Sequence, residues 1–334
     1  FYVVDAATGQ FISGDNYVPV NWATGLDANG RPIEVPEARY SKAPFQQTPG
    51  PLGGHNWQPM AFNPDLGLAY IPAQEIPQAY AEDPRFTSRP TGWNTGIDFS
   101  AGVPPIAPPE VAKMLRASLK GRLIAWDPVA RKPRWTVEHG NAWNGGVLST
   151  AGGIVFQGKL SGDLVAYDAA TGDKLWEHPL KSGGASGPGT YMIDGEQYVT
   201  ITTGWGSAFA LAAGFGFDEK VSSSVGKVVT FKLGGTAEIA DTGLAPIDAT
   251  PKAPAFGSLA MVSEGTVHYA RNCAVCHGPL AVSSGVLPDL RWSAITGNKD
   301  AWKGVVLDGN LAANGMVSFA DYLTPDEAEA IRAY

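Results

Sequence analysis

The sequence carries little charge, few cysteines and no long apolar run. Lysine and arginine total 24 against 32 aspartate and glutamate, which gives a net charge of −8, and no basic run reverses this balance. Nucleic acid is therefore excluded as an expected partner. No stretch approaches the roughly 18 uninterrupted apolar residues of a membrane-spanning helix. No signal peptide is visible, but both ends fall inside secondary-structure patterns. We therefore expect both ends to be cut, and membrane association stays open.

Glycine, proline and tryptophan are abundant instead. The chain has 41 Gly, 26 Pro and 10 Trp, with 44% hydrophobic and 17% charged residues. This composition favours a packed all-β chain with many turns over a disordered one. A length of 334 residues allows one large β-architecture together with a small second domain.

An internal repeat accounts for many of the turns. Each copy combines a short apolar strand, an aspartate, a turn and a return strand. The copies are FYVVDAATGQFI from Phe1, LIAWDPVARKPRW from Leu123 and LVAYDAATGDKLW from Leu164. Asp127 and Asp168 lie 41 residues apart, a period typical of one four-stranded propeller blade.

Further strand-like runs lie between the copies: GLAYIPA, GGIVFQG, QYVTITTGW and GKVVTFKLGG. Residues 1–235 therefore hold material for about four blades. The repeated Asp, Gly and Trp, which include Trp135 and Trp176, are assigned to turns, hairpins and packing between blades. We interpret residues 75–122, rich in Pro and Gly, as an excursion with a short helix near residues 109–119.

The composition changes after the β-rich part. Residues 236–256 are mostly Ala, Pro, Thr and Gly, which is typical of a linker. The pattern then becomes helical over 259–272 and again from Thr324, where TPDE predicts a capping box completed by Glu327. The sequence thus predicts a small α-helical domain over 257–334.

Both cysteines lie in Cys273-Ala-Val-Cys276-His277. Two thiols at this spacing can each form a thioether with a haem vinyl group, and the adjacent imidazole then reaches the iron. The alternatives are a redox disulfide, half of a zinc site, or coincidence. A zinc site lacks further ligands nearby, and a thioredoxin-like site would need a βαβ context. The motif therefore predicts a covalently bound c-type haem ligated by His277.

The sixth iron ligand should be a soft or imidazole donor. Met316 is the one methionine after the motif, 39 residues beyond His277, in a glycine-flanked loop before the last helix. His268 competes, but it precedes Cys273 on the entry helix, whose geometry directs it elsewhere. We expect Met316, because a His–Met pair raises the reduction potential and suits an electron carrier.

Residues 255–334 resemble the class I cytochrome c domains. The matching pattern is EGTVHYARNCAVCHG, then PDL, then GMVSF and a closing helix. The resemblance implies that Gly265 and Tyr269 pack against the last helix. It also implies that the carbonyl of Pro288 accepts a hydrogen bond from His277, which would fix the imidazole tautomer.

The β-rich part resembles the quinohaemoprotein alcohol dehydrogenases. The resemblance rests on GGHNWQPMAFNPDLGLAYIPA, NWATGLDANGRPIE, WNGGVLSTAGGIVFQG, GGASGPGTY and GEQYVTITTGWG. Members of that family pair an eight-bladed propeller, which binds pyrroloquinoline quinone (PQQ) and calcium, with a C-terminal cytochrome c. The expected fold is a partial eight-bladed all-β propeller of about four blades, followed by a small all-α class I cytochrome c domain.

The resemblance also implies a PQQ site. Residues that match Asn56 and Trp57 contact the quinone, Asn56 through polar atoms at its carbonyl edge. A planar quinone with three carboxylates needs aromatic faces and donors around its rim. Trp143, in AWNGG, and Trp205, in a comparable closing segment, are further candidates, although packing explains a propeller tryptophan equally well.

Other functional residues of that family are expected upstream of Phe1. They are the lysine at the quinone, the aspartate that acts as general base, the calcium ligands, and a pair of cysteines beside the cofactor. We therefore assign no catalytic base and no calcium ligand to this chain. By itself the chain is not expected to oxidise a substrate.

The resemblance implies PQQ-dependent oxidation of alcohols to aldehydes in the periplasm. Electrons would leave through haem c to an external copper protein, cytochrome or quinone. The alternative is a non-catalytic propeller–cytochrome subunit for electron transfer or binding. An upstream half without a calcium–quinone site would favour it. A haem d1 nitrite reductase joins the same folds but places the cytochrome first. Fold alone does not separate these functions.

Overall fold

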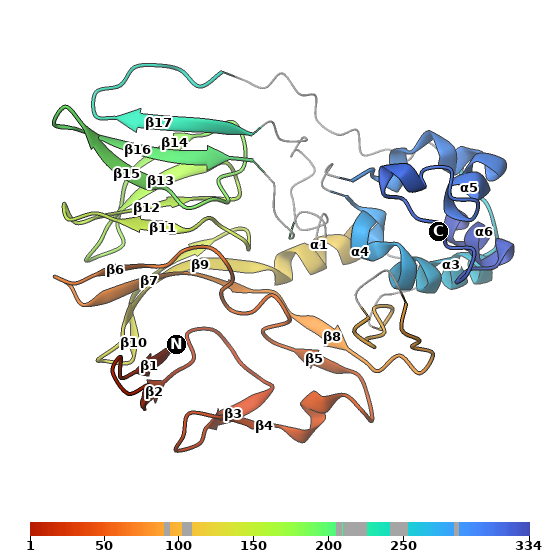
Figure 1. Ribbon diagram of the computed structural model, residues 1–334, viewed down its shortest axis with the longest axis horizontal. Coiled ribbons are helices and arrows are strands. Elements are labelled where there is room, and N and C mark those ends of the chain that lie inside the picture. The colour runs from red at the N-terminus through yellow and green to blue at the C-terminus, as the bar shows by residue number, and fades with distance from the viewer. Residues whose placement is uncertain (90–93, 102–108, 205–208, 210–225, 241–252, 284–286) are drawn as a thin grey trace. The chain divides into compact units, whose positions relative to one another are not determined.

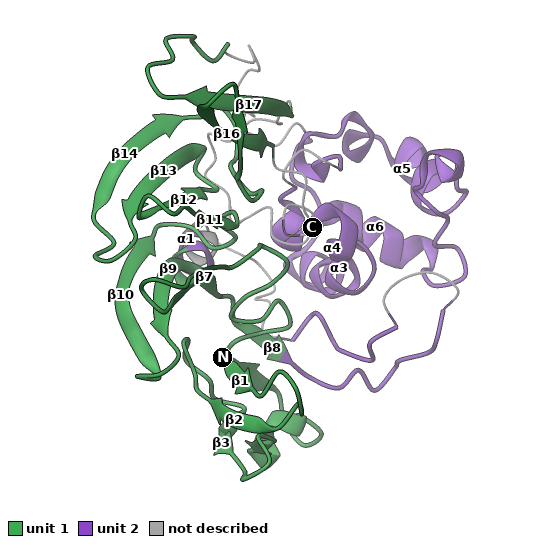
Figure 2. Ribbon diagram, turned by 60° about the vertical axis from the view of Figure 1, so that its left-hand side comes forward, with its two compact units in different colours: residues 1–79, 117–207, 224–244 green, residues 80–116, 208–223, 245–334 purple. Residues whose placement is uncertain are grey.

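The computed structural model describes residues 1–89, 94–101, 109–204, 209, 226–240, 253–283 and 287–334. The chain divides into two compact units, which Figure 2 shows in different colours. Unit 1 contains residues 1–79, 117–207 and 224–244, and unit 2 contains residues 80–116, 208–223 and 245–334. Each unit is described by itself.

Unit 1 is built from antiparallel sheets (Figure 1). The first four-stranded sheet has the order β6-β7-β9-β10, with strands β6 (Ala61–Asn63), β7 (Leu68–Glu75), β9 (Lys120–Asp127) and β10 (Lys132–His139). The second runs in chain order through β11 (Val147–Ser149), β12 (Ile154–Gly158), β13 (Asp163–Asp168) and β14 (Lys174–Pro179). A third sheet contains β15 (Gly189–Ile193), β16 (Glu196–Thr203) and β17 (Lys227–Lys232). In-order antiparallel sheets of four strands are the blades of a propeller.

Shorter pairs complete the described strands. They are β1 (Tyr2–Val4) with β2 (Phe11–Gly14), β3 (Ala23–Leu26) with β4 (Pro32–Glu34), and β5 (Phe45–Gln47) with β8 (Gln78–Tyr80). A short 3-10 helix, η1 (Pro36–Arg39), lies between β4 and β5. The predicted propeller sheets are confirmed: two are complete four-stranded blades, and a third has three described strands.

The aspartates of the repeat form the hairpin turns. The carboxylate of Asp168 accepts hydrogen bonds from the backbone N–H groups of Ala170 and Thr171, each at 2.9 Å. Gly172 then adopts a φ of 79°, in the left-handed region where a glycine carries no Cβ penalty. In the second copy Arg131 occupies the equivalent backbone position with a φ of 59°. The turn geometry is therefore retained without glycine, and the predicted turn role is confirmed.

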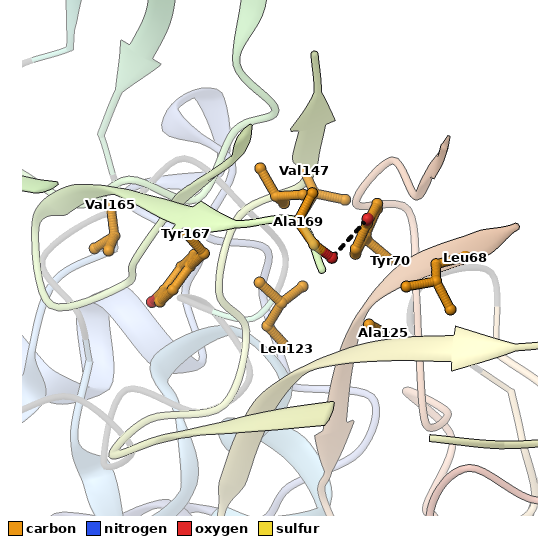
Figure 3. Close-up of a cluster of buried hydrophobic side chains, with 9 residues drawn as sticks. Leu68, Tyr70, Leu123, Ala125, Val147, Val165, Tyr167 and Ala169 are labelled. Atoms are coloured by element: carbon orange, nitrogen blue, oxygen red, sulfur yellow. Dashed lines mark hydrogen bonds between the residues drawn. The ribbon is translucent and has the colours of Figure 1, made fainter. Parts of the chain in front are cut away.

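The core of unit 1 lies between successive blades. Figure 3 shows side chains from β7, β9, β11 and β13 in one buried cluster: Leu68, Tyr70, Leu123, Ala125, Val147, Val165 and Tyr167, together with Ala169. The hydroxyl of Tyr70 donates to the carbonyl of Ala169 at 2.9 Å, drawn as a dashed line. Trp135 on β10 donates to the same carbonyl at 3.1 Å. Trp176 on β14 meets Phe231 of β17 edge to face at 5.4 Å between ring centroids. Both tryptophans thus pack against the next sheet, as predicted.

Replacing Trp135 with alanine should lower the free energy of unfolding by about 2 to 3 kcal/mol, because it removes a half-buried indole from the boundary between two blades. Chemical denaturation followed by circular dichroism measures the change. Trp135→Phe is the matched control. It loses the indole N–H and the five-membered ring but keeps a phenyl ring at the boundary, and the Ala169 carbonyl still accepts from Tyr70, so the cost should be about 1 kcal/mol. Equal losses in the two variants would contradict this packing role.

Unit 2 is mainly helical. Its helices are α3 (Leu259–Asn272), α4 (Ala274–His277), α5 (Lys299–Val306) and α6 (Pro325–Ala333), with short 3-10 turns η3 (Pro279–Ala281), η4 (Leu290–Trp292), η5 (Ala294–Gly297) and η6 (Ala312–Asn314). Thr324 and Glu327 form the predicted capping box. The sequence did not predict α5. None of the described helices combines the length and apolar composition needed to cross a bilayer.

The excursion predicted within 75–122 leaves its blade between β7 and β9. It passes through β8, and the predicted short helix is present as α1 (Pro109–Ser118), which leads directly into β9. Residues 80–116 belong to unit 2 together with α3 to α6. We refer to residues 80–116 as the insertion. The insertion therefore separates β7 from β9, two neighbouring strands of one blade, although it belongs to unit 2.

Candidate functional site

The two cysteines lie at the junction of α3 and α4. Cys273 is the C-cap of α3 and the N-cap of α4, and its side chain is buried, whereas Cys276 is exposed. Both are free. Burial, and secondarily the nearby Cys276, raises the pKa of Cys273 to about 12. The thiol is then protonated at neutral pH, which is unlike a redox-active cysteine, whose pKa is lowered.

His277 is oriented by a hydrogen bond of its second ring nitrogen. Its side chain is buried, and Nδ1 lies 2.8 Å from the carbonyl oxygen of Pro288. A carbonyl can only accept, so Nδ1 carries the proton and Nε2 keeps the lone pair that a metal requires. The hydrogen bond that the cytochrome resemblance implied is therefore present.

The cluster around the motif is apolar. It contains Tyr269, Cys273, Trp302, Val306, Leu307, Leu323, Ala328 and Ile331, and Met316 packs against it. Met316 follows η6 and Gly315, whose φ of 92° ends that turn. The thioether thus belongs to the same cluster as Cys273. A buried imidazole with a free Nε2, two thiols and an apolar wall fit a covalently bound haem.

His268 has other partners. Its Nε2 lies 3.4 Å from a carboxylate oxygen of Glu327 and 3.8 Å from one of Glu264. The imidazole therefore faces carboxylates of α3 and α6. Met316 remains our prediction for the sixth iron ligand.

Other metal sites are not evident in the described part of the chain. Among those residues, no group of three or more His, Cys, Asp or Glu is placed to hold a metal ion. The described residues therefore do not fit a zinc site at the cysteines. They also contain no acidic cluster for calcium.

Asn56 and Trp57 lie in the segment that precedes β6. The amide of Asn56 is used locally: Nδ2 donates to the carbonyl of Leu52 at 3.0 Å, and Oδ1 accepts from the N–H of Trp57 at 2.9 Å. These bonds fix the turn and leave Trp57 51% exposed. An exposed indole on a fixed turn is a suitable face for stacking a planar ligand.

The segments that precede β6, β11 and β15 approach one another closely. A Cβ on Gly146 would lie 2.3 Å from Pro59, and a Cβ on Gly187 would lie 2.6 Å from it. The N–H of Val147 donates to the carbonyl of Pro59 at 2.9 Å. Only glycines allow this approach. The turn of Trp57 is thus joined to the start of the next two sheets.

Trp143 has an unusual backbone. Its φ is 64°, in the left-handed region that is rare for a bulky residue, and its side chain is 2% exposed. The next residue, Asn144, is fixed by a hydrogen bond: its Oδ1 accepts from the backbone N–H of Leu160 at 3.1 Å. Strain of this kind is concentrated at functional sites. Trp205 lies outside the described residues.

Gln58 was not predicted as a site residue. Its side chain is 2% exposed, and neither amide atom has a hydrogen-bond partner among the described residues. Buried amides are nearly always satisfied, so such a group calls for an explanation. A ligand with carbonyl or carboxylate groups beside Trp57 would accept hydrogen bonds from Nε2, and a ligand N–H or O–H group could donate to Oε1. The sequence signal was its position directly after Asn56 and Trp57.

Comparisons with known proteins agree with this geometry. Residues 32–199 match the family described as glucose/ethanol/alcohol dehydrogenase, beta-propeller domain, and residues 260–334 match cytochrome C oxidase, cbb3-type, subunit III. The quinohemoprotein alcohol dehydrogenase of Comamonas testosteroni is 40% identical over all of this chain and 46% of its own length. Quinohemoprotein alcohol dehydrogenase ADH-IIG of Pseudomonas putida is 42% identical over all of this chain and 47% of its own. The chain spans about half the length of these curated relatives.

Solved structures show the same relationship. The quinohemoprotein alcohol dehydrogenase ADHIIG from Pseudomonas putida aligns with a TM-score of 0.86 at 41% identity, over 100% of this chain and 49% of that one. The enzyme from Comamonas testosteroni aligns with a TM-score of 0.81 at 39% identity, over 100% of this chain and 48% of that one. The propeller sheets, the haem motif and these matches together place the chain: it belongs to the glucose/ethanol/alcohol dehydrogenase β-propeller family, and it is related to the quinohaemoprotein alcohol dehydrogenases along its whole length.

Proposed function

We propose that this chain is the part of a PQQ-dependent alcohol dehydrogenase that passes electrons from the quinone to haem c. The observation that carries the proposal is that one chain contains both a candidate quinone site and a candidate haem site. A propeller segment holds Asn56, Trp57 and the unsatisfied Gln58, and a helical unit holds a CxxCH motif whose histidine is oriented by Pro288.

The chemistry divides between the two groups. Oxidation of an alcohol to an aldehyde releases two electrons and two protons, and PQQ, when bound, supplies a two-electron acceptor. Trp57 would stack on the planar ring, while Asn56 and Gln58 would offer amide groups to its polar rim. Haem iron accepts one electron at a time. The electrons would therefore leave singly.

In the helical unit, Cys273 and Cys276 would hold the haem covalently, with His277 and Met316 as axial ligands. A His–Met pair raises the reduction potential and suits onward transfer. The acceptor would be an external copper protein, cytochrome or quinone. Covalent haem attachment through the CxxCH motif also supports a periplasmic location.

The division of labour along the chain follows from the same proposal. Residues 1–235 would supply propeller blades, 236–256 a linker, and 257–334 the cytochrome domain. Trp143 and Trp205 stay candidates for PQQ contacts. The catalytic base and the calcium ligands would come from residues outside this chain, and the substrate would be an alcohol.

Steady-state oxidation tests the proposed function. The full-length protein, freed of cofactor and then supplied with PQQ and calcium, should convert a primary alcohol to its aldehyde with a dye as electron acceptor. Aldehyde formation should depend on added PQQ. If a series of primary alcohols gives no aldehyde and a series of secondary alcohols gives no ketone in the reconstituted protein, the proposal is wrong.

Trp57→Ala should weaken PQQ binding about tenfold, because one aromatic stacking contact contributes about 1 kcal/mol or slightly more. Quenching of tryptophan fluorescence during titration with PQQ measures the affinity. Trp176→Ala is the matched control, because this tryptophan is also partly exposed, at 39%, but lies on the outer strand β14 and meets Phe231 edge to face. Equal weakening by both variants would contradict a specific role of Trp57.

A further inference from the structure

The insertion is tied to α3, the helix that ends directly before Cys273, by a mostly buried group of charges. Nη2 of Arg271 lies 3.0 Å from Oδ2 of Asp98 and 3.3 Å from Oδ1 of Asp83, and its Nε lies 3.3 Å from Oδ1 of Asp98. The side chains of Arg271, Asp83 and Asp98 are 14%, 17% and 19% exposed. Breaking a mostly buried pair by removing one partner leaves an uncompensated charge, which is strongly unfavourable.

The two aspartates are presented together by the local fold of the insertion. The N–H of Asp83 donates to the carbonyl of Gly96, and the N–H of Asp98 donates to the carbonyl of Ala81, each at 2.9 Å. An isolated antiparallel bridge joins Glu82 to Ile97 between them. Two short extended segments therefore place both carboxylates on Arg271.

A second arginine joins the same two segments, but here the arginine lies on the insertion and its partner lies on α3. Nη1 of Arg89, on the insertion, donates to Oδ1 of Asn272 at 2.8 Å, and its guanidinium lies 4.3 Å from the ring centroid of Tyr322. Asn94 holds the backbone of Arg89 through two hydrogen bonds, at 2.8 and 2.7 Å. The insertion thus contacts both residues that directly precede Cys273, namely Arg271 and Asn272.

The insertion is also continuous with the propeller strands. The chain enters it from β8, which pairs with β5, and leaves it through α1 into β9. A segment that is flanked in sequence on both sides by residues of unit 1 therefore binds the end of α3, directly before the haem cysteines. Because Arg271 and Asn272 immediately precede Cys273, movement of the insertion would be transmitted to the haem attachment point.

We propose that the Asp83–Asp98–Arg271 cluster and Arg89 make the insertion a docking element for the cytochrome helices, and that Arg271 is a positioning residue for electron transfer from quinone to haem. This inference rests on the proposed function. The contacts would hold the haem in the arrangement competent for transfer. Without them the competent arrangement would be only fractionally populated, and transfer would slow in proportion.

The test uses the full-length, PQQ-loaded protein with D83N/D98N substitutions on the insertion, which lie far from the haem motif in sequence. After rapid mixing with alcohol, haem reduction should be roughly tenfold slower than in the unmodified protein, as expected for a tenfold smaller competent population. Dye reduction directly at the quinone, haem content and haem midpoint potential should be unchanged. Arg271→Lys should be intermediate, because an ammonium lacks the planar fork that reaches both carboxylates.

Glu329→Gln is the matched control. Glu329 pairs with Arg332 at 2.6 Å within α6, and this pair is also mostly buried, but it does not involve the insertion. Its variant should reduce haem at the normal rate. An unchanged haem-reduction rate in D83N/D98N, or an equal slowing of dye reduction, would overturn the proposal.

Hydrogen–deuterium exchange separates this inference from the proposed function. The backbone amides of residues 81–98 should exchange faster in D83N/D98N than in the unmodified protein, whether or not alcohol drives any chemistry. If the unmodified protein shows no alcohol-dependent haem reduction, the proposed function fails while exchange still reports on the docking contacts. Unchanged exchange at 81–98 would overturn the docking role itself.

Discussion

A variant with both Cys273 and Cys276 replaced by alanine will lose covalently bound haem completely. The two thioethers are the only covalent links that the motif offers, and an apolar pocket with two axial ligands would keep haem only by reversible binding. The two thiols differ in exposure: Cys273 is buried in a cluster with Tyr269 and Trp302, and Cys276 is exposed. Haem staining after denaturing electrophoresis measures the loss directly. A stained band in the double variant would contradict attachment at these residues.

His268→Ala is the matched control for this experiment. It removes an imidazole from the same helix, but one that faces Glu327 and Glu264. Covalent haem and the absorbance bands of a His–Met haem should both be retained. Met316→Ala, by contrast, should keep the stain and lose those bands. The three variants together separate attachment from ligation.

Gly265→Ala should lower the free energy of unfolding of the helical unit by about 3 kcal/mol or more, at the upper end for an overpacked contact. A Cβ at this position would lie 1.9 Å from the carbonyl oxygen of Ala330 and 2.5 Å from its carbon. These are backbone atoms of α6 and cannot rotate away, so the two helices must separate. Such a loss should lower the midpoint of thermal unfolding by roughly 10 to 20 °C in a unit of this size.

The loss of the Soret band on heating measures this midpoint. Gly297→Ala is the matched control within the same unit, because no atom lies within 4 Å of a Cβ built there. That variant should unfold within a few degrees of the unmodified protein. A stable Gly265→Ala protein would mean that α3 and α6 do not cross as closely as the structure shows.

Local rules predicted the elements whose signals are contained in adjacent residues. Helix α3 begins and ends at the predicted residues, and α6 begins directly after its predicted N-cap, Thr324. The turns at the hairpin aspartates were also predicted, because the carboxylate of Asp168 accepts hydrogen bonds from backbone N–H groups only two and three residues ahead. The resemblance to the class I cytochrome c domains implied the contact between His277 and Pro288, which the structure contains.

Contacts that depend on distant segments were not predicted. Asp83 and Asp98 meet Arg271 only because the insertion folds back on α3, and nothing local in either segment indicates this. The same is true of Gln58, whose unsatisfied amide is visible only once its burial is known. The close approach at Gly146 and Gly187 likewise requires the positions of three sheets.

The central claim is that electrons travel from a quinone in the propeller to the haem of the same protein. Rapid mixing of the oxidised, PQQ-loaded full-length protein with alcohol, followed at the haem α band, tests it most directly. The reduced band should appear within a single turnover, and it should not appear when PQQ is omitted. Aldehyde formation with a haem that stays oxidised, or haem reduction that needs no PQQ, would contradict the account.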